Sequence, residues 1–299
     1  RIHARVSCPL IDRHGPHAGM MSSPRVSVIL PCFNAAATVR RAIESITAQT
    51  FQQWELIAFN DGSTDATGEI LHELSAIDRR IRVIKSSHVG IVEALTAACT
   101  QATGTYLARM DADDVSRATR LARQVELMDN VNNLALCGTC VRMVGPAIGY
   151  GRRRYERWIN RLISHDDIVR ELFVECPIPH PTFMLRRETF ERIGGYQDHG
   201  WAEDYDLCMR LFRAGARFAK VSEPLLDWTE SATRHSMTSE RYSPQQFRRL
   251  KRHYLFKSFL RERPTFHQWG AGEVGKLWLR EWEGRQPTAV VDINPNKIG

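Results

Sequence analysis

Apolar and polar positions alternate between two periods from residue 24 to residue 110. Short apolar runs rich in β-branched residues predict buried strands, and the segments between them repeat apolar residues at helical spacing. Because strand and helix alternate four times, we expect an α/β fold in which helices cover a mainly parallel sheet. The predicted strands are Val26–Leu30, Trp54–Phe59, Ile81–Ile84 and Thr105–Met110, and the predicted helices are Ala35–Gln49, 64–77 and Val89–Ala102.

Polar clusters follow three of these strands, at residues 31–34, 60–64 and 111–114. Parallel sheets bind ligands at the carboxyl ends of their strands, where the chain changes direction across the sheet. We therefore expect the three clusters to meet in one binding cleft.

Two acidic clusters are candidates for catalysis. Asp111 and Asp113 lie one residue apart after a strand, so both carboxylates can converge on one divalent cation. Glu203 and Asp204 precede an apolar helix, and a carboxylate that points into a cleft can act as a general base toward a hydroxyl. Taken alone, the first cluster is also typical of a solvated loop, and the second is typical of a helix cap.

A series of motifs in residues 24–228 resembles the family 2 glycosyltransferases. The resemblance implies the GT-A nucleotide-diphospho-sugar transferase fold and inverting transfer of a sugar from a nucleotide-diphosphate sugar, with a UDP-sugar expected. The implied acceptor is a hydroxyl of a saccharide or of a lipid-linked acceptor, in bacterial cell-surface polysaccharide or glycolipid synthesis. The motifs are SVILPCFNA (27–35), QTF (49–51), WELI (54–57), NDGSTD (60–65), ARMDADD (108–114), RLARQ (120–124), HPTFM (180–184), GGY (194–196) and EDYDL (203–207).

The resemblance also implies a role for each candidate site residue. Asp204 matches the catalytic base, with Glu203 beside it, and Asp113 matches the acid that binds Mn²⁺ or Mg²⁺. His235 lies near the place of a late metal-binding histidine, but its surroundings differ from the family pattern, and Asn60 replaces a more usual Asp. The implied nucleotide-sugar contacts are Pro31, Phe33, Asn34, Asp61, Asp111 and Ala112, and the implied acceptor or sugar contacts are His180 and Trp201.

Two segments follow the predicted catalytic domain, which we place at residues 24–235. Residues 236–263 form a basic helical extension, since nine Lys or Arg residues stand against two acids from Arg234 to Arg263. Such a helix can pack on the catalytic domain, lie on an anionic membrane or hold an acidic acceptor. Residues 264–299 resemble part of a Rossmann-like βαβ unit, which is either a second nucleotide site or a packing remnant. This resemblance rests on Gly270, Gly272, Gly275 and Asp292 in a strand-turn-helix-strand context.

Composition restricts the class of protein further. The chain has 299 residues, 43% hydrophobic residues and a net charge of +7, which indicates a globular protein that suits anionic ligands. Its seven cysteines are scattered, and no run of 18 apolar residues occurs, so we expect a cytoplasmic protein. The basic extension leaves open a peripheral association at the inner face of the membrane. Residues 1–23 lack apolar periodicity and indicate a disordered or tag-like tail.

Two other functions are weighed against sugar transfer. A GT-A-like nucleotidyltransferase needs a Gly-rich loop with Lys or Arg after the first strand, which residues 31–34 do not provide. A basic nucleic-acid-binding protein would agree with the net charge, but the sequence has no recognised nucleic-acid-binding module. We therefore expect no nucleic acid partner.

Overall fold

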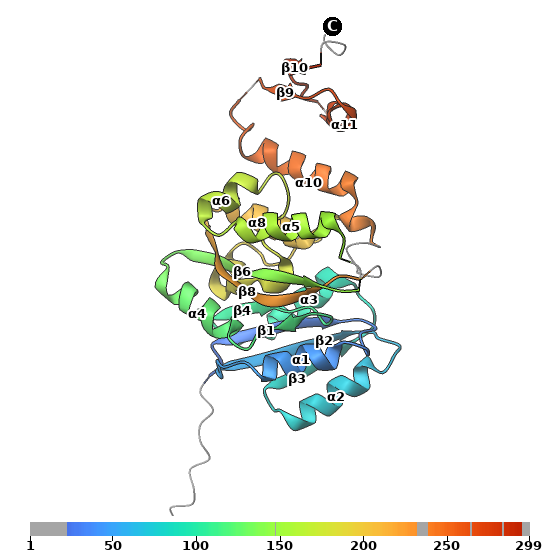
Figure 1. Cartoon of the computed structure of the whole chain (residues 1–299), viewed down its shortest axis with the longest axis vertical. Coiled ribbons are helices and arrows are strands. Elements are labelled where there is room, and N and C mark those ends of the chain that lie inside the picture. Colours follow the sequence, from blue (N-terminus) through green and yellow to red (C-terminus); the bar gives the residue numbers. More distant parts are fainter. Residues whose placement is uncertain (1–22, 147, 232–238, 264, 283, 295–299) are drawn as a thin grey trace, which may run out of the picture.

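A mixed sheet runs through the part of the chain from β1 to β8 (Figure 1). The computed structural model describes residues 23–146, 148–231, 239–263, 265–282 and 284–294, so the predicted tail at 1–23 lies almost wholly outside the described residues. Within the described part, this sheet has eight strands in the order β3-β2-β1-β4-β7-β6-β8-β5. The strands are β1 (Val26–Cys32), β2 (Trp54–Asp61), β3 (Ile81–Ser86), β4 (Tyr106–Arg109), β5 (Val115–Ser116), β6 (Leu134–Val144), β7 (Met184–Arg186) and β8 (Arg217–Thr229).

The N-terminal half of the sheet is parallel, as the alternating pattern predicts. Strand β1 pairs in parallel with β2 and β4, and β2 pairs in parallel with β3. Alternate residues of β1 enter different cores: Val28 and Leu30 pack on one face of the sheet, and Ile29 packs on the other. Both faces are covered, which explains why these strands read as continuous apolar runs. The covering helices of this half are α1 (Val39–Thr47), α2 (Thr67–Ile77) and α3 (Ile91–Thr100).

The second half of the sheet contains antiparallel pairs. Strand β7 lies antiparallel between β4 and β6, and β5 pairs antiparallel with β8. The long β6–β8 pair is parallel and has register shifts near Thr139 and Cys140. The helical elements of this part are α4 (Arg120–Asn130), α5 (Tyr150–Arg161), α6 (His165–Glu171), the 3-10 helix η1 (His180–Thr182), α7 (Arg187–Arg192) and α8 (Glu203–Arg213).

The basic extension packs against α8 and its neighbours. It contains the 3-10 helix η2 (Glu240–Tyr242) and α10 (Pro244–Lys257), and Leu250 and Tyr254 of α10 are buried. A two-stranded parallel sheet follows, with β9 (His267–Trp269), α11 (Glu273–Glu281) and β10 (Ala289–Val291). No helix in the described ranges has both the length and the apolar character needed to cross a membrane.

Candidate active site

The three predicted polar clusters meet at one edge of the sheet, where β1, β2 and β4 end. Asn34 joins the first two clusters, because its backbone N–H donates to Ser63 Oγ at 3.0 Å and its Oδ1 accepts the Thr64 N–H at 2.9 Å. It adopts a φ of 48°, a conformation that Asn tolerates better than most residues. Pro31 lies within β1, opposite Phe59 of β2. The sheet edge therefore brings the polar clusters close together, and a binding cleft there stays a prediction.

An exposed aromatic pair stands above the buried Asp61 carboxylate. The rings of Phe33 and His88 are stacked, with centroids 4.2 Å apart and an interplanar angle of 24°, and Phe33 is 48% exposed. Asp61 accepts the backbone N–H groups of Val89 at 2.6 Å and Gly90 at 3.0 Å, and its carboxylate lies 2.9 Å from His88 Nδ1. Asp61 thus holds the loop after β3, and the stacked rings offer a flat surface for a planar group.

His88 is a candidate site residue that sequence reasoning missed. Its only sequence signal is its position, two residues after the end of β3 and at the same sheet edge as the other clusters. The close approach of its loop depends on Gly62, which has a φ of 69°. A Cβ added at Gly62 would lie 2.5 Å from the His88 backbone nitrogen, so a larger residue would displace the loop.

The carboxylates of Asp111, Asp113 and Asp114 gather after β4. One oxygen from each lies within 4.8 Å of the others, and oxygen donors of this kind suit Mg²⁺ or Mn²⁺. The end of β8 fixes the loop, since Asp114 Oδ1 accepts the Thr229 N–H at 2.8 Å and Thr229 Oγ1 donates to the Asp113 carbonyl at 2.6 Å. Ala112 packs against the core between the acids. The residues present therefore fit a divalent cation.

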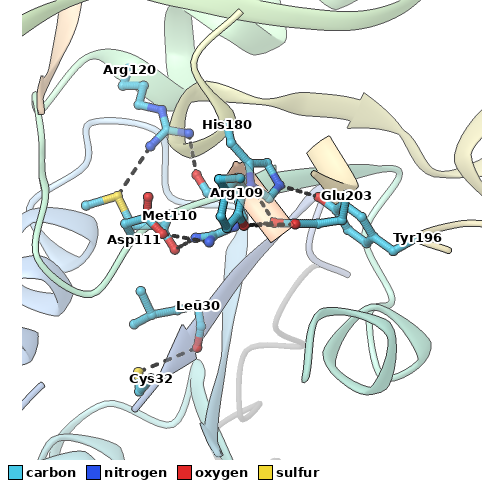
Figure 2. Close-up of polar contacts among 10 residues, drawn as sticks. Leu30, Cys32, Arg109, Met110, Asp111, Arg120, His180, Tyr196 and Glu203 are labelled. Atoms are coloured by element: carbon cyan, nitrogen blue, oxygen red, sulfur yellow. Dashed lines mark hydrogen bonds and ion pairs between the residues drawn. The ribbon is translucent and has the colours of Figure 1, made fainter. Parts of the chain in front are cut away.

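Buried Arg109 connects this cluster to the second acidic pair (Figure 2). Its guanidinium lies 2.6 Å from Asp111 Oδ1, with Glu203 and His180 on its other side. Burial lowers the pKa of Arg109, but Asp111, Tyr196 and Glu203 together outweigh burial, so the net pKa lies above its ordinary value. Arg120 donates to the Arg109 carbonyl at 2.6 Å from a fully buried position. Sequence reasoning assigned Arg109 no role, because nothing local indicates that its side chain turns inward.

Glu203 and Asp204 begin helix α8 in different surroundings. Glu203 is only 1% exposed, and the Tyr242 hydroxyl lies 2.9 Å from both of its carboxylate oxygens. Burial raises the pKa of Glu203. Asp204 is partly exposed and accepts the backbone N–H of Tyr205 at 2.7 Å. Burial and the neighbouring Glu203 raise the pKa of Asp204 to about 8, which suits a group that must take up a proton.

His180 lies between Glu203 and the Tyr196 hydroxyl. Its Nε2 is 2.7 Å from the Tyr196 oxygen, and its Nδ1 is 3.8 Å from Glu203 Oε1. Burial and the nearby Arg109 hold the pKa of His180 well below its usual range, so the ring is neutral at pH 7. His180 can therefore orient Glu203 or a bound hydroxyl without adding charge.

Comparison with known proteins identifies the family. The family model described as "Glycosyl transferase family 2" matches residues 27–194, more than half of the chain. The chain belongs to glycosyltransferase family 2. It is similar to an uncharacterized glycosyltransferase of Haemophilus influenzae, with 28% identity over 240 residues that cover 78% of this chain and 74% of the relative. It is also similar to the putative glycosyltransferase EpsE of Bacillus subtilis, with 31% identity over 229 residues, 75% of this chain and 80% of the relative.

Solved structures confirm the GT-A fold of this glycosyltransferase. S. aureus TarS in complex with UDP-GlcNAc aligns with a TM-score of 0.63 and 19% identity over 78% of this chain and 66% of that chain. The mannosyltransferase PcManGT from Pyrobaculum calidifontis, in complex with GDP-Man and Mn²⁺, aligns with a TM-score of 0.56 and 19% identity over 80% of this chain and 65% of that chain. This chain thus corresponds to about two thirds of each of these structures.

Trp201 and Asp206 of the glycosyltransferase serve the packing of α8. The Trp201 indole donates to Asp206 Oδ1 at 2.9 Å, and the Tyr254 hydroxyl donates to the same oxygen at 2.7 Å. The other Asp206 oxygen is ion-paired with Arg210 at 2.7 Å. Both carboxylate oxygens of buried Asp206 already accept hydrogen bonds within the protein. Asp206 is therefore a poor candidate for the base.

The remaining predicted site residues lie in the C-terminal part. His235 lies outside the described residues. Gly270 and Gly275 form a close turn before α11, where a Cβ on Gly275 would lie 2.1 Å from the Gly270 carbonyl oxygen, and Gly272 is the residue before the helix. The Asp292 carboxylate accepts the Ala271 N–H at 2.6 Å, so it closes the loop from within the chain. The strand-turn-helix geometry is present, and a second nucleotide site stays a prediction.

Proposed function

We propose that this glycosyltransferase transfers a sugar from a nucleotide-diphosphate sugar to an acceptor hydroxyl with inversion, and that it requires Mn²⁺ or Mg²⁺. The observation that carries the proposal is buried Arg109, which contacts Asp111 at 2.6 Å and has Glu203 on its other side. Asp111 of the proposed cation site and Glu203, the residue before the proposed base Asp204, lie on opposite sides of this guanidinium, which supports the proposal. The donor's reacting carbon would lie between them.

The residues proposed to bind the donor lie at the carboxyl ends of β1 to β4 and in the loops that follow them. The nucleobase stacks on the Phe33–His88 pair, and Asp61, Pro31 and Asn34 shape the walls around it. Asp111, Ala112 and Asp113 lie where the diphosphate binds, with Asp113 as a cation ligand. When bound, the cation supplies charge that stabilises the departing nucleoside diphosphate. The UDP-GlcNAc complex of TarS and the GDP-Man and Mn²⁺ complex of PcManGT support this assignment by likeness of fold.

The residues proposed to bind and activate the acceptor lie at the start of α8. Asp204 takes the proton of the acceptor hydroxyl as its oxygen forms a bond to the anomeric carbon, while the bond from that carbon to the diphosphate oxygen breaks. A single displacement from the opposite face inverts the configuration. Glu203 keeps a fixed position through Tyr242 and orients the acceptor with His180. The partial exposure of Asp204 supports its assignment as the base, because a hydroxyl can reach it from solvent.

We further propose a saccharide acceptor in polysaccharide synthesis and a UDP-sugar donor. The O-antigen biosynthesis glycosyltransferase WbnJ of Escherichia coli, which is 29% identical over 209 residues, supports the acceptor class. The UDP-GlcNAc and UDP complexes of TarS support the nucleotide.

A donor screen followed by product analysis tests the proposal. Thermal shift measured with a panel of UDP- and GDP-sugars should show stabilisation that depends on Mn²⁺ or Mg²⁺ and disappears in EDTA, because a ligand that binds only the folded state raises Tm. NMR of the transfer product should show an anomeric configuration opposite to that of the donor. Donor binding that is indifferent to EDTA would contradict the cation requirement, and retention of configuration would contradict the single displacement.

A further inference from the structure

A groove between helix α10 and the loop before α8 has no role in the reaction proposed above. Its volume is about 410 Å³, within the range of sites that hold small organic ligands. Five of its lining residues recur at i, i+3, i+4, i+7 and i+8 along α10, so one whole face of the helix faces the groove. The lining residues are Trp201, Arg249, Arg252, His253, Phe256 and Lys257.

The described lining of this groove is cationic and contains no acid. Arg249 and Lys257 are exposed and lie roughly 12 Å apart along the helix axis, at the two ends of the face. Arg252 is partly buried and donates to the Glu281 backbone carbonyl. Burial lowers the pKa of His253, and the positive charges of Lys257 and His199 lower it further. The groove therefore concentrates positive potential against a low-dielectric wall.

The groove shares Trp201 with the segment that leads into helix α8, where Glu203 and Asp204 lie. The Trp201 ring, 5.3 Å from the His253 ring, is two residues before Glu203 in the chain. Arg241 donates to the Trp201 carbonyl at 2.7 Å, and the next residue, Tyr242, contacts Glu203. The donor loops lie on the opposite side of Arg109. One wall of the groove is therefore joined, through Trp201 and Arg241, to the segments that surround Glu203.

We propose that this groove binds a phosphate or diphosphate group carried by the acceptor substrate. The inference rests on the acceptor half of the proposed function. Arginine and lysine are the side chains that bind phosphate oxygens best, and Trp201 and Phe256 give the groove an apolar wall for the group attached to the phosphate. Because these cationic side chains line a concave groove, we expect them to bind a single phosphate group better than a flat lipid surface.

Titration of the full chain with inorganic pyrophosphate in EDTA, followed by calorimetry, tests the groove. The variant Arg249→Gln/Lys257→Gln should bind pyrophosphate at least tenfold more weakly than the wild type. Both replaced side chains are exposed, so the fold should be retained. The matched control is Arg79→Gln/Arg154→Gln, which removes two exposed arginines outside the groove and should bind like the wild type. Equal affinity in the groove variant and the wild type, or an equal loss in the control, would overturn the proposal.

Two further measurements distinguish a phosphate site in the groove from the proposed donor site and from a membrane-binding surface. Mn²⁺-dependent UDP binding should be the same in the wild type and the groove variant. Absence of UDP binding in the wild type would contradict the proposed donor site, whereas the pyrophosphate result would still stand. Sedimentation with phosphatidylcholine vesicles, with and without phosphatidylglycerol, tests the membrane. Binding to anionic vesicles that requires Arg249 and Lys257, in a protein that does not bind pyrophosphate, would assign the groove to a lipid surface and show the proposal to be wrong.

Discussion

Replacing Asp204 by asparagine removes the proposed base while it preserves the size of the side chain. The asparagine Oδ1 can still accept the Tyr205 N–H that Asp204 accepts at 2.7 Å, so the start of α8 should keep its geometry. General-base assistance contributes about 10²- to 10⁴-fold to a rate, and we expect kcat for transfer to fall within that range. The affinity for UDP should change little, because the residues proposed to bind it lie at the carboxyl ends of β1 to β4 and in the loops that follow them.

The same substitution should stabilise the fold at alkaline pH. The pKa of Asp204 is raised from an ordinary value of 3.8 to about 8, mainly by burial and by Glu203. A carboxyl whose pKa is raised in the folded state contributes stability below its unfolded pKa and loses it as the pH rises through the folded pKa. Because Asp204 keeps contact with solvent and titrates together with Glu203, we expect a stability difference of about 1–2 kcal/mol, not the several kcal/mol of an isolated buried acid.

Two assays on the wild type and Asp204→Asn decide the matter. Transfer kinetics should show the loss in kcat, and the wild-type rate should rise with pH as the Glu203–Asp204 pair ionises. Thermal denaturation at about pH 5 and about pH 9 should show a Tm gap in favour of Asp204→Asn that widens at the higher pH. A rate near that of the wild type would move the base to Glu203, since Asp206 is held by Trp201, Tyr254 and Arg210. A gap that narrows with pH would refute the raised pKa.

Three other substitutions test separate parts of the site. Asp113→Ala should abolish cation-dependent UDP binding in calorimetry, whereas the exposed Asp166→Ala should not; unchanged binding would remove Asp113 from the cation site. His88→Ala should weaken UDP binding about three- to tenfold without altering its dependence on Mn²⁺, because the aromatic pair loses one ring. Tyr242→Phe removes the hydroxyl that donates to Glu203, so the pKa of that acid should rise. The pH–rate profile should then shift to higher pH. A profile that stays in place would show that Glu203 does not share in the titration.

The parallel half of the fold could be predicted from sequence because each buried strand there is a continuous apolar run. Strands β1 to β4 fall within a residue or two of their predicted ranges. The short strands of the second half gave no such signal, since β5 and β7 have only two and three residues, too few for a period to appear. The fate of these short segments depends on their antiparallel partners, which lie far away in the chain.

In the candidate site too, residues placed by local spacing could be predicted, and residues placed by long-range packing could not. Asp111 and Asp113 could be placed because both lie in one turn after one strand, so spacing alone brings their carboxylates together. Arg109 differs, because its place beside Glu203 depends on how residues 94 positions apart pack. Its sequence neighbours are compatible with a side chain that points to solvent. His88 could not be predicted from sequence, because its ring becomes part of a stacking surface only through the contact with Phe33.

The surroundings of Glu203 extend beyond the predicted domain boundary at residue 235. The hydroxyl that contacts both of its oxygens belongs to Tyr242, and the guanidinium that holds the preceding Trp201 carbonyl belongs to Arg241. A chain cut at residue 235 would leave a carboxylate that is almost fully buried without this donor, and an unsatisfied buried acid costs about 1–3 kcal/mol or more. It would also lose the side of the groove that α10 provides. The basic extension thus completes the surroundings of Glu203 and the groove, because Tyr242, Arg241 and α10 all belong to it.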